Sequence, residues 1–248
     1  MNKKINYDTA FWKIRSQHYN ELEWANHRLY LDSFIKSGNF KKRDIVLDVG
    51  TGTGIVAHAL SPFVKEVIGL DRSQDMLEHS NWRGNMYFIK RNILDSIFES
   101  GVFDKVTCRQ VFHHILKHRQ KAMDECYRLL RQGGTMVFSE GVPPTKRVRE
   151  NYIEIFRLKE RRVTFYEEDL TGLMKNAGFK KIRLSTVCLK RISVRKWLAN
   201  SGLSKAVQEK IYLLHEKAPR YFKEDYDMVE INNDCLINMK MIIVTGNK

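Results

Sequence analysis

The stretch Val46-Leu-Asp-Val-Gly-Thr-Gly-Thr-Gly54 joins a short apolar strand to a glycine-rich turn, and a helical pattern of Val56, Ala57 and Leu60 follows it. Glycines let a backbone turn sharply and approach a ligand closely. The first amides of the helix then face the ligand and favour a negative group such as a carboxylate. The stretch therefore predicts a strand–turn–helix unit that binds a small molecule where the strand ends.

Around this unit, strand patterns alternate with helical patterns along the chain. Such alternation implies parallel βαβ units with right-handed crossovers. The predicted fold is α/β, a doubly wound, Rossmann-like, mostly parallel sheet of seven strands with helices on both faces. The expected strands are residues 45–47, 64–70, 86–89, 103–108, 135–138, 181–189 and 236–245.

Two helix boundaries are predicted from local signals. Gly133-Gly134 is expected to stop an amphipathic helix that includes Ala122 to Leu130. Thr164 and Glu167 have the spacing of a capping box, which predicts a helix that starts there and ends at Gly178.

The chain is expected to have three parts. Residues 1–40 have apolar side chains at helical spacing and are predicted to form a helical lid. Residues 41–192 and 233–248 form the predicted ligand-binding core. Residues 193–232 lie between the last two expected strands and are predicted to form a helical cap insertion over the binding site.

Composition predicts a cytoplasmic protein without a membrane span. The four cysteines of the 248 residues are far apart and form no CxxC pair, which favours a reduced chain over a disulfide scaffold or a zinc site. No stretch approaches the roughly 18 apolar residues of a spanning helix. The start, Met1 to Lys4, is basic, but no apolar run follows it as in a secretory signal.

The net charge of +14 is concentrated in one segment. Residues 146–196 hold 15 Lys and Arg against 6 Asp and Glu, a difference of 15 − 6 = +9. A basic face suggests an anionic partner, for which phosphorylated small molecules, RNA and membrane surfaces all qualify. The alternative is a surface on which the lysines are solvated and have no partner.

The glycine turn does not match the dinucleotide fingerprint GxGxxG, because Ile55 stands at its final position. The pattern is GxGxG, with Asp48 two residues before the first glycine. Asp71 closes the second expected strand, where an acidic residue binds ribose hydroxyls and repels a ribose phosphate. Together with the alternating pattern, these residues indicate a nucleoside-containing ligand.

Over roughly residues 40–141 the motifs resemble class I S-adenosylmethionine (SAM)-dependent methyltransferases. His113-His114 is similar to the branch that includes ubiquinone and menaquinone biosynthesis methyltransferases. Arg91-Asn92-Ile93 departs from the usual third motif, although the Asn92 amide can still hydrogen-bond an adenine edge. The resemblance implies SAM as cofactor, and the implied cofactor-binding residues are Asp48, Gly50, Thr51, Gly52, Gly54, Asp71, Arg72, Met76, Asn92, Ile93, Arg109 and Tyr19.

His113 and His114 are candidate catalytic bases. They follow the fourth expected strand at the carboxyl edge of the sheet, where ligands bind. A base helps methyl transfer when the acceptor is a hydroxyl or an ammonium. The alternative is that one histidine packs under the cofactor and the other lies at a helix start. A metal site with His118 is a further reading, but no carboxylate stands at helical spacing to complete it, so no metal is predicted.

Two other groups have both functional and structural readings. Tyr19 belongs to an aromatic N-terminal segment that would exclude water from the cofactor as a lid. Arg109 contacts the cofactor in one reading and pairs with Asp104 in the other. The basic run Arg157, Lys159, Arg161 and Arg162 holds an anionic substrate or is a solvated helix face.

The sequence therefore predicts a SAM-dependent enzyme that methylates a small molecule, with an anionic or phosphorylated acceptor as one option. An RNA methyltransferase is the alternative that the charge supports, although no Asn-Pro-Pro-Tyr-type motif follows the fourth strand. A SAM-binding partner protein without catalysis is a third reading, and a dehydrogenase is the fourth. Monomer and homodimer both remain open.

Overall fold

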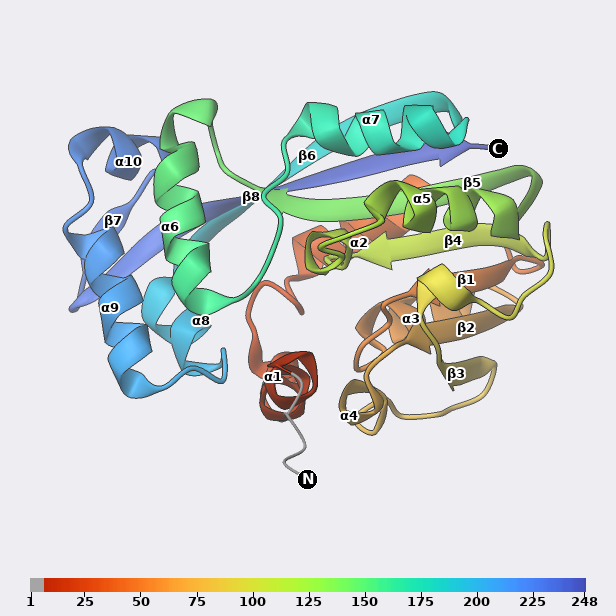
Figure 1. Ribbon diagram of the computed structural model, residues 1–248, viewed down its shortest axis with the longest axis horizontal. Coiled ribbons are helices and arrows are strands. Elements are labelled where there is room, and N and C mark those ends of the chain that lie inside the picture. The colour runs from red at the N-terminus through yellow and green to blue at the C-terminus, as the bar shows by residue number, and fades with distance from the viewer. Residues whose placement is uncertain (1–6) are drawn as a thin grey trace.

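The sheet is the framework of the molecule in the computed structural model, which describes residues 7–248 (Figure 1). Its order is β3-β2-β1-β4-β5-β8-β6, with β1 to β5 parallel, β8 antiparallel to both neighbours, and β7 paired to β8. All seven expected strands are present, and the predicted doubly wound fold is confirmed. The strands are β1 (Ile45–Val49), β2 (Glu66–Asp71), β3 (Met86–Lys90), β4 (Phe103–Arg109), β5 (Leu130–Val142), β6 (Lys180–Ser193), β7 (Val229–Ile231) and β8 (Asp234–Asn247).

Helices cover both faces of the sheet because neighbouring residues of each buried strand point to opposite sides. Val46 belongs to the apolar core under α2 and α3, whereas Leu47 belongs to the core under α5 and α7. The bounds on these faces are α2 (Arg28–Gly38), α3 (Ile55–Leu60), α5 (Arg119–Leu129) and α7 (Glu167–Ala177), with the short α4 (Gln74–Leu77) after β2. Single 3-10 turns are η1 (Tyr19–Glu21), η2 (Ser61–Phe63), η3 (Ile93–Asp95), η4 (Phe112–His114) and η5 (Lys146–Val148).

A group of helices lies beyond one end of the sheet, at the carboxyl ends of the parallel strands (Figure 1). The strands β6 and β8 have 14 residues each against five in β1, and their extra length reaches into this group. Residues 193–232 hold α8 (Val194–Ala199), α9 (Lys205–Glu216), α10 (Arg220–Asp225) and β7. A further helix, α6 (Arg149–Lys159), was not predicted. It lies in the connection between β5 and α7 and packs against α9 in this group. We call α6 and α8–α10 the cap.

The N-terminal helix α1 (Tyr7–Ser16) lies between the cap and the β1–β3 side of the sheet (Figure 1). Residues 1–6, with the basic start of the chain and the first part of the predicted lid, lie outside the described residues. Within residues 7–248, no helix combines the length and the apolar character that crossing a membrane requires.

Two helix boundaries predicted from local signals were wrong, the end of α5 and the start of α7, whereas the predicted end of α7 at Gly178 is confirmed. The helix α5 ends at Leu129, and Leu130 already pairs in β5, so Gly133-Gly134 lies within the strand where the β4–β5 register shifts. The helix α7 begins at Glu167, and the backbone N–H of Tyr166 donates to the Asp169 carboxylate at 2.8 Å. The box is therefore displaced by two residues from the Thr164–Glu167 spacing. Pairing of strands decided the first boundary, and a competing acidic residue decided the second.

Candidate active site at the carboxyl edge of the sheet

The glycine turn after β1 has the conformation that its sequence demands. Gly50, Gly52 and Gly54 have φ of 66°, 58° and 84°, a region that side chains rarely tolerate. The backbone N–H groups of Gly50 and Thr51 donate to the Leu70 carbonyl at 2.7 and 3.1 Å, which fixes the turn to β2. A Cβ at Gly50 would stand 2.3 Å from a methyl carbon of Val111. The turn is therefore rigid and packed on one side.

Asp71 braces this turn from the end of β2. One carboxylate oxygen accepts the Gly52 N–H at 2.9 Å, and the other accepts the Ser73 N–H at 2.9 Å. Burial raises the pKa of Asp71, while these two bonds and the neighbouring Arg72 lower it. Each oxygen keeps a second lone pair for a ligand hydroxyl. The residue predicted to bind ribose thus also holds the loop in shape.

A cavity of about 370 Å³ lies over the turn and the ends of β1, β2 and β4. Met76 is buried at its wall, next to Gly52. The Asn92 side-chain oxygen accepts the Leu94 N–H at 3.1 Å and caps η3, so its amide NH2 remains as a donor. Eight residues predicted to bind the cofactor line this cavity, and they are Tyr19, Gly50, Gly52, Asp71, Arg72, Met76, Asn92 and Ile93. We call it the cofactor cavity.

Four predicted cofactor residues lie behind the cavity wall and do not line it: Asp48, Thr51, Gly54 and Arg109. The Asp48 carboxylate accepts the Thr107 hydroxyl at 2.7 Å, and burial raises its pKa to about 6. The Arg109 guanidinium donates to the Ala25 carbonyl at 2.9 Å and stacks over the Tyr30 ring at 5.2 Å. Asp104 pairs instead with Arg131, so the alternative reading, in which Arg109 pairs with Asp104, was wrong. Arg109 ties the segment before α2 to the sheet.

A second cavity, of about 80 Å³, lies between the cap and the sheet edge. That volume holds roughly half a dozen waters, so the cavity accepts a small molecule or the end of a larger one. Its walls come from α1, η4, β5, α6, α8–α10 and β8. Four side chains border both cavities: Trp12, Tyr19, Gln110 and His114. We call it the acceptor cavity.

His113 in η4 is held by a carboxylate at the end of β5. Its Nδ1 lies 2.6 Å from the Glu140 Oε2, and the other Glu140 oxygen accepts backbone N–H groups of Val111, Phe112 and His113 at 3.1, 2.7 and 3.3 Å. Burial holds the pKa of His113 well below its usual value and raises the pKa of Glu140 to about 7. With Glu140 ionised, Nδ1 carries the proton and Nε2 keeps its lone pair on the side of the acceptor cavity.

His114 lies at the boundary of the two cavities. Its ring packs edge-on against Trp12 at 4.8 Å between centroids and lies 4.0 Å from the His113 ring. Burial holds the pKa of His114 well below its usual value, and repulsion from the neighbouring His113 lowers it further. No carboxylate partner orients this ring among the hydrogen bonds of residues 7–248. Of the two candidate bases, His113 has the geometry that orients a ring nitrogen, and His114 is part of the shared wall.

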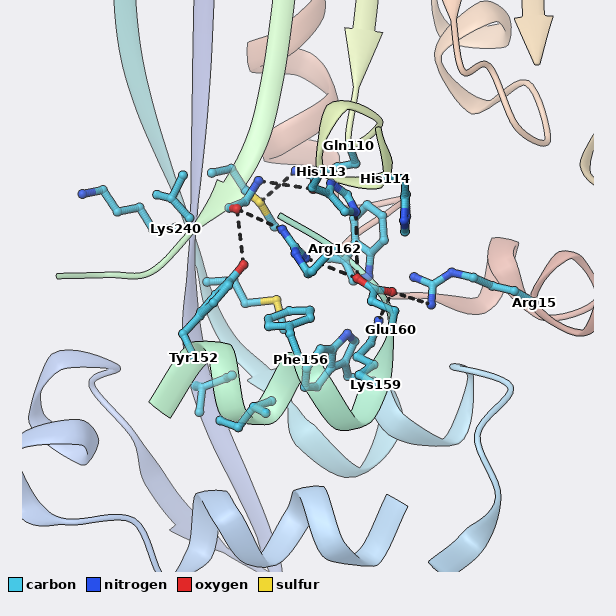
Figure 2. Close-up of a pocket in the computed structure, with 18 of the residues that line it drawn as sticks. Arg15, Gln110, His113, His114, Tyr152, Phe156, Lys159, Glu160, Arg162 and Lys240 are labelled. Carbon is cyan, nitrogen blue, oxygen red and sulfur yellow. Dashed lines mark hydrogen bonds and ion pairs between the residues drawn. The ribbon is translucent and has the colours of Figure 1, made fainter. Parts of the chain in front are cut away.

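The far wall of the acceptor cavity holds charged side chains around Glu160 (Figure 2). The Glu160 carboxylate lies 3.9 Å from the His113 Nε2, and with both histidines it forms a group whose ligand atoms lie within 4.8 Å of one another. His118 is exposed and outside this group, so it does not join the other two histidines as the metal reading required, and the carboxylate that this reading lacked is Glu160. Lys159 and Arg162 also border the cavity, whereas Arg157 and Arg161 are exposed.

Sequence reasoning missed the two acidic residues near His113, which are Glu140 and Glu160. Glu140 stands at the end of the fifth strand, next to Ser139, and its place at the carboxyl edge was a usable signal. Glu160 follows α6, a helix that was not predicted, and nothing local marks it as buried. The sequence could not show which members of the basic run around Glu160 face the cavity. In the structure Lys159 and Arg162 do so, and Arg157 and Arg161 face solvent.

Comparison with known proteins identifies the domain. Residues 47–138 match the family described as methyltransferase domain. The uncharacterized methyltransferase YcgJ of Bacillus subtilis is 32% identical over 152 residues, 59% of each chain. Demethylmenaquinone methyltransferase of Staphylococcus haemolyticus is 27% identical over 73% of this chain and 89% of its own. The crystal structure of YcgJ has a TM-score of 0.79 at 23% identity and covers 90% of this chain and 99% of that one.

For three of the curated relatives, among them YcgJ, the chain spans only about half of the relative's length, from 43% to 59%. The matched residues include the glycine turn, Asp71, η3 and both histidines, which is the wall of the cofactor cavity and its border with the second cavity. The cap lies outside the match. The chain therefore contains a methyltransferase domain of the class I, SAM-dependent type.

Proposed function

We propose that this protein transfers a methyl group from SAM to a small molecule held in the acceptor cavity. The observation that carries the proposal is the shared wall of the two cavities, formed by Trp12, Tyr19, Gln110 and His114. A donor on one side and an acceptor on the other would meet there, away from bulk water. Holding two reactants in this way is worth several kcal/mol of the barrier.

The cofactor cavity fits SAM by its donor set. The turn at Gly50 and Gly52 offers backbone amides to a carboxylate, and Asp71 offers acceptor lone pairs to ribose hydroxyls. Met76 and Ile93 give apolar contacts for an adenine ring, and the Asn92 amide gives a donor for its edge. Arg72 and Tyr19 complete the wall. Asp48, Thr51, Gly54 and Arg109 support it from behind.

When bound, SAM supplies the electrophilic methyl group. His113 accepts the proton that a hydroxyl or ammonium acceptor releases, and it does so at Nε2. Glu140 holds the proton on Nδ1 and stabilises the imidazolium that results. Trp12 and Tyr19 close the site on the N-terminal side and exclude water. A positioned base of this kind contributes typically 100- to 10,000-fold to the rate.

An RNA substrate is the second candidate, because residues 146–196 carry the charge difference of 15 − 6 = +9. The described ion pairs weaken this reading. On the surface of this segment, at least five cations contact carboxylates: Lys146, Arg147, Arg149, Arg191 and Arg195. Pairing leaves less free charge for a phosphate backbone, whose affinity depends on it. The cap also encloses the acceptor cavity from several sides.

The test uses SAM with a labelled methyl group, purified protein, and a cell lysate separated by size with and without ribonuclease. We expect label in the low-mass fraction, and no label with the variant Gly52→Val. Ribonuclease-sensitive label in the large fraction would contradict the proposal in favour of RNA. Full S-adenosylhomocysteine (SAH) binding by calorimetry without any transferred label would identify a cofactor-binding protein without catalysis.

A further inference from the structure

One carboxylate in the wall of the acceptor cavity is contacted by three cations (Figure 2). The Glu160 oxygens lie 3.3 Å from the Arg15 Nη1, 2.7 Å from the Lys159 Nζ and 3.3 Å from the Arg162 Nη1. The cations come from α1, the last residue of α6 and the segment after it. We call these four residues the Glu160 cluster.

The cluster is buried and its charges do not balance. The side chains of Arg15, Lys159 and Arg162 are 5%, 2% and 6% exposed, and that of Glu160 is 3% exposed. Burial and the neighbouring Arg15 lower the pKa of Lys159 to about 7, so Arg15, Arg162 and a partly protonated Lys159 face the one carboxylate of Glu160. Glu140, the other buried acid nearby, is engaged with His113 and backbone amides. Buried charges without compensation are costly. An anion placed in the cavity would remove that cost.

The cations are held in place by aromatic rings as well as by Glu160. Lys159 lies 5.3 Å over the Trp197 ring, and Arg162 lies 4.2 Å over the Phe156 ring. Arg15 lies 5.9 Å from the centre of the Tyr19 ring, and the buried Nε–H of Arg15 has no hydrogen-bond partner among residues 7–248. The donors are thus preorganised and have capacity left, as in sites that bind oxyanions through guanidinium groups.

We infer that the methyl acceptor carries a compact anionic oxygen group, a carboxylate or a phosphate, that Arg15, Lys159 and Arg162 hold beside His113. The inference rests on the proposed function, because it names the substrate class of the same cavity. Glu160 keeps the three cations in position and leaves a net positive charge for the ligand. The cavity of about 80 Å³ matches the size of such a group.

An outer groove supports this assignment. It shares Phe156, Glu160 and Arg162 with the acceptor cavity, and its other charged residues are Arg149, Arg157 and Arg161. Arg149 pairs with Glu150, and the exposed Arg157 lies along the approach, where a cation raises the local concentration of anions. The same cluster argues against a metal at His113, His114 and Glu160, because a metal ion would compete with three cations for one carboxylate.

The test compares a carboxylate with its neutral isostere on protein saturated with SAH. Calorimetry measures the dissociation constants of benzoate, benzamide and inorganic phosphate for the natural chain, for Lys159→Met and for the control Lys146→Met. Lys146 is an exposed lysine of the same segment, paired with Glu168. We expect at least one anion to bind about tenfold or more tighter than benzamide, and Lys159→Met to remove that preference. The control should keep it.

Preference for phosphate over benzoate assigns the phosphate, and the reverse assigns the carboxylate. Equal binding of benzamide, no binding of either anion, or an unchanged preference in Lys159→Met would overturn the inference. So would tight zinc binding that displaces both anions. If Lys159→Met does not fold, Arg15→Gln is the second variant. Failure of SAH to bind the natural chain would refute the proposed function instead, whereas SAH binding without anion binding refutes this inference alone.

Discussion

The cofactor cavity and the acceptor cavity are built in different ways. The first takes most of its polar groups from short continuous stretches, namely the turn after β1, the end of β2 and the start of η3. Its ligand-facing groups include backbone amides of the turn, the Asp71 carboxylate and the Asn92 amide. The second takes its polar groups from α1, η4 and the segment at the end of α6, with charged side chains from the first and the last and two histidines from η4. The first is a local property of the sheet edge, and the second exists only after the cap has folded over it.

This difference separates what the two cavities require of mutations. A change in the cofactor cavity should alter SAM affinity and leave the cap intact. A change in the acceptor cavity should alter turnover or acceptor binding and leave SAM affinity intact. Each of the predictions below tests whether the effects of the two cavities can be separated in this way.

Gly52→Val should have the largest effect, a loss of measurable SAM binding. A side chain at this position, where φ is 58°, would crowd the Met76 methyl, 3.0 Å from the Cβ position, and would enter the cavity where the ligand approaches. Gly84→Val is the matched control, because Gly84 has φ of 59° and nothing within 4 Å of its Cβ position. Both variants carry the same backbone strain, and calorimetry with SAH should detect binding only in the control. Retained binding in Gly52→Val would remove the turn from the cofactor site.

His113→Gln should lower kcat by roughly 100-fold or more while SAH affinity stays unchanged. The substitution removes the Nε2 lone pair that Glu140 orients. His114→Gln should change kcat less, since His114 acts as a wall, and exposed His79→Gln serves as the neutral control. Single-turnover rates with the identified acceptor measure the effect. If both His113→Gln and His114→Gln keep full turnover, no base is used and alignment alone carries the reaction.

Asp71→Asn should weaken SAM binding by roughly 10- to 100-fold, the range expected for hydrogen bonds to a charged group. The amide keeps the shape of the side chain, but its nitrogen accepts no hydrogen bond, neither from the backbone nor from a ribose hydroxyl. Asp75→Asn in the neighbouring α4 is the control. The ratio of SAH dissociation constants gives the result, and an affinity equal to the control would rule out the ribose role.

The pH dependence of kcat should show the smallest effect, a fall of about tenfold per unit below pH 7. Burial raises the pKa of Glu140 to about 7, so its acid form dominates below that pH. A protonated Glu140 donates to Nδ1 of His113, which moves the ring proton to Nε2 and removes the base. The rate should therefore rise with pH through about 7 and then level off. In Glu140→Gln, kcat should no longer fall below pH 7 in this way. The same fall as in the natural chain would contradict control of His113 by Glu140.

The same contrast explains how far the sequence could predict the molecule. The strands and the glycine turn follow from apolar runs and from glycines that a positive φ requires, both of which are local. Asp71 was predicted from its place at a strand end. The end of α5 was not, because pairing of Leu130 with Phe103 in the sheet overrode the glycine signal. Sheet pairing is a long-range effect that local patterns do not contain.

Prediction of the acceptor cavity failed for a similar reason. The pairing of His113 with Glu140 joins residues 27 positions apart, and that of Arg15 with Glu160 joins the first helix to the end of α6. A charged residue in such a run reads as a solvated face until the fold shows which ones turn inward. Lys159 and Arg162 turn inward, and Arg161 between them does not.

The most direct test of the central claim is a crystal structure of the protein with SAH. We expect the SAH sulfur to lie at the border of the two cavities, next to Trp12, Tyr19, Gln110 and His114. The ribose hydroxyls should donate to the Asp71 carboxylate. The turn at Gly52 should then lie on the cofactor side of that border, and His113 should lie on the acceptor side. An SAH molecule whose sulfur points away from that border, or one bound outside the cofactor cavity, would contradict methyl transfer between the two.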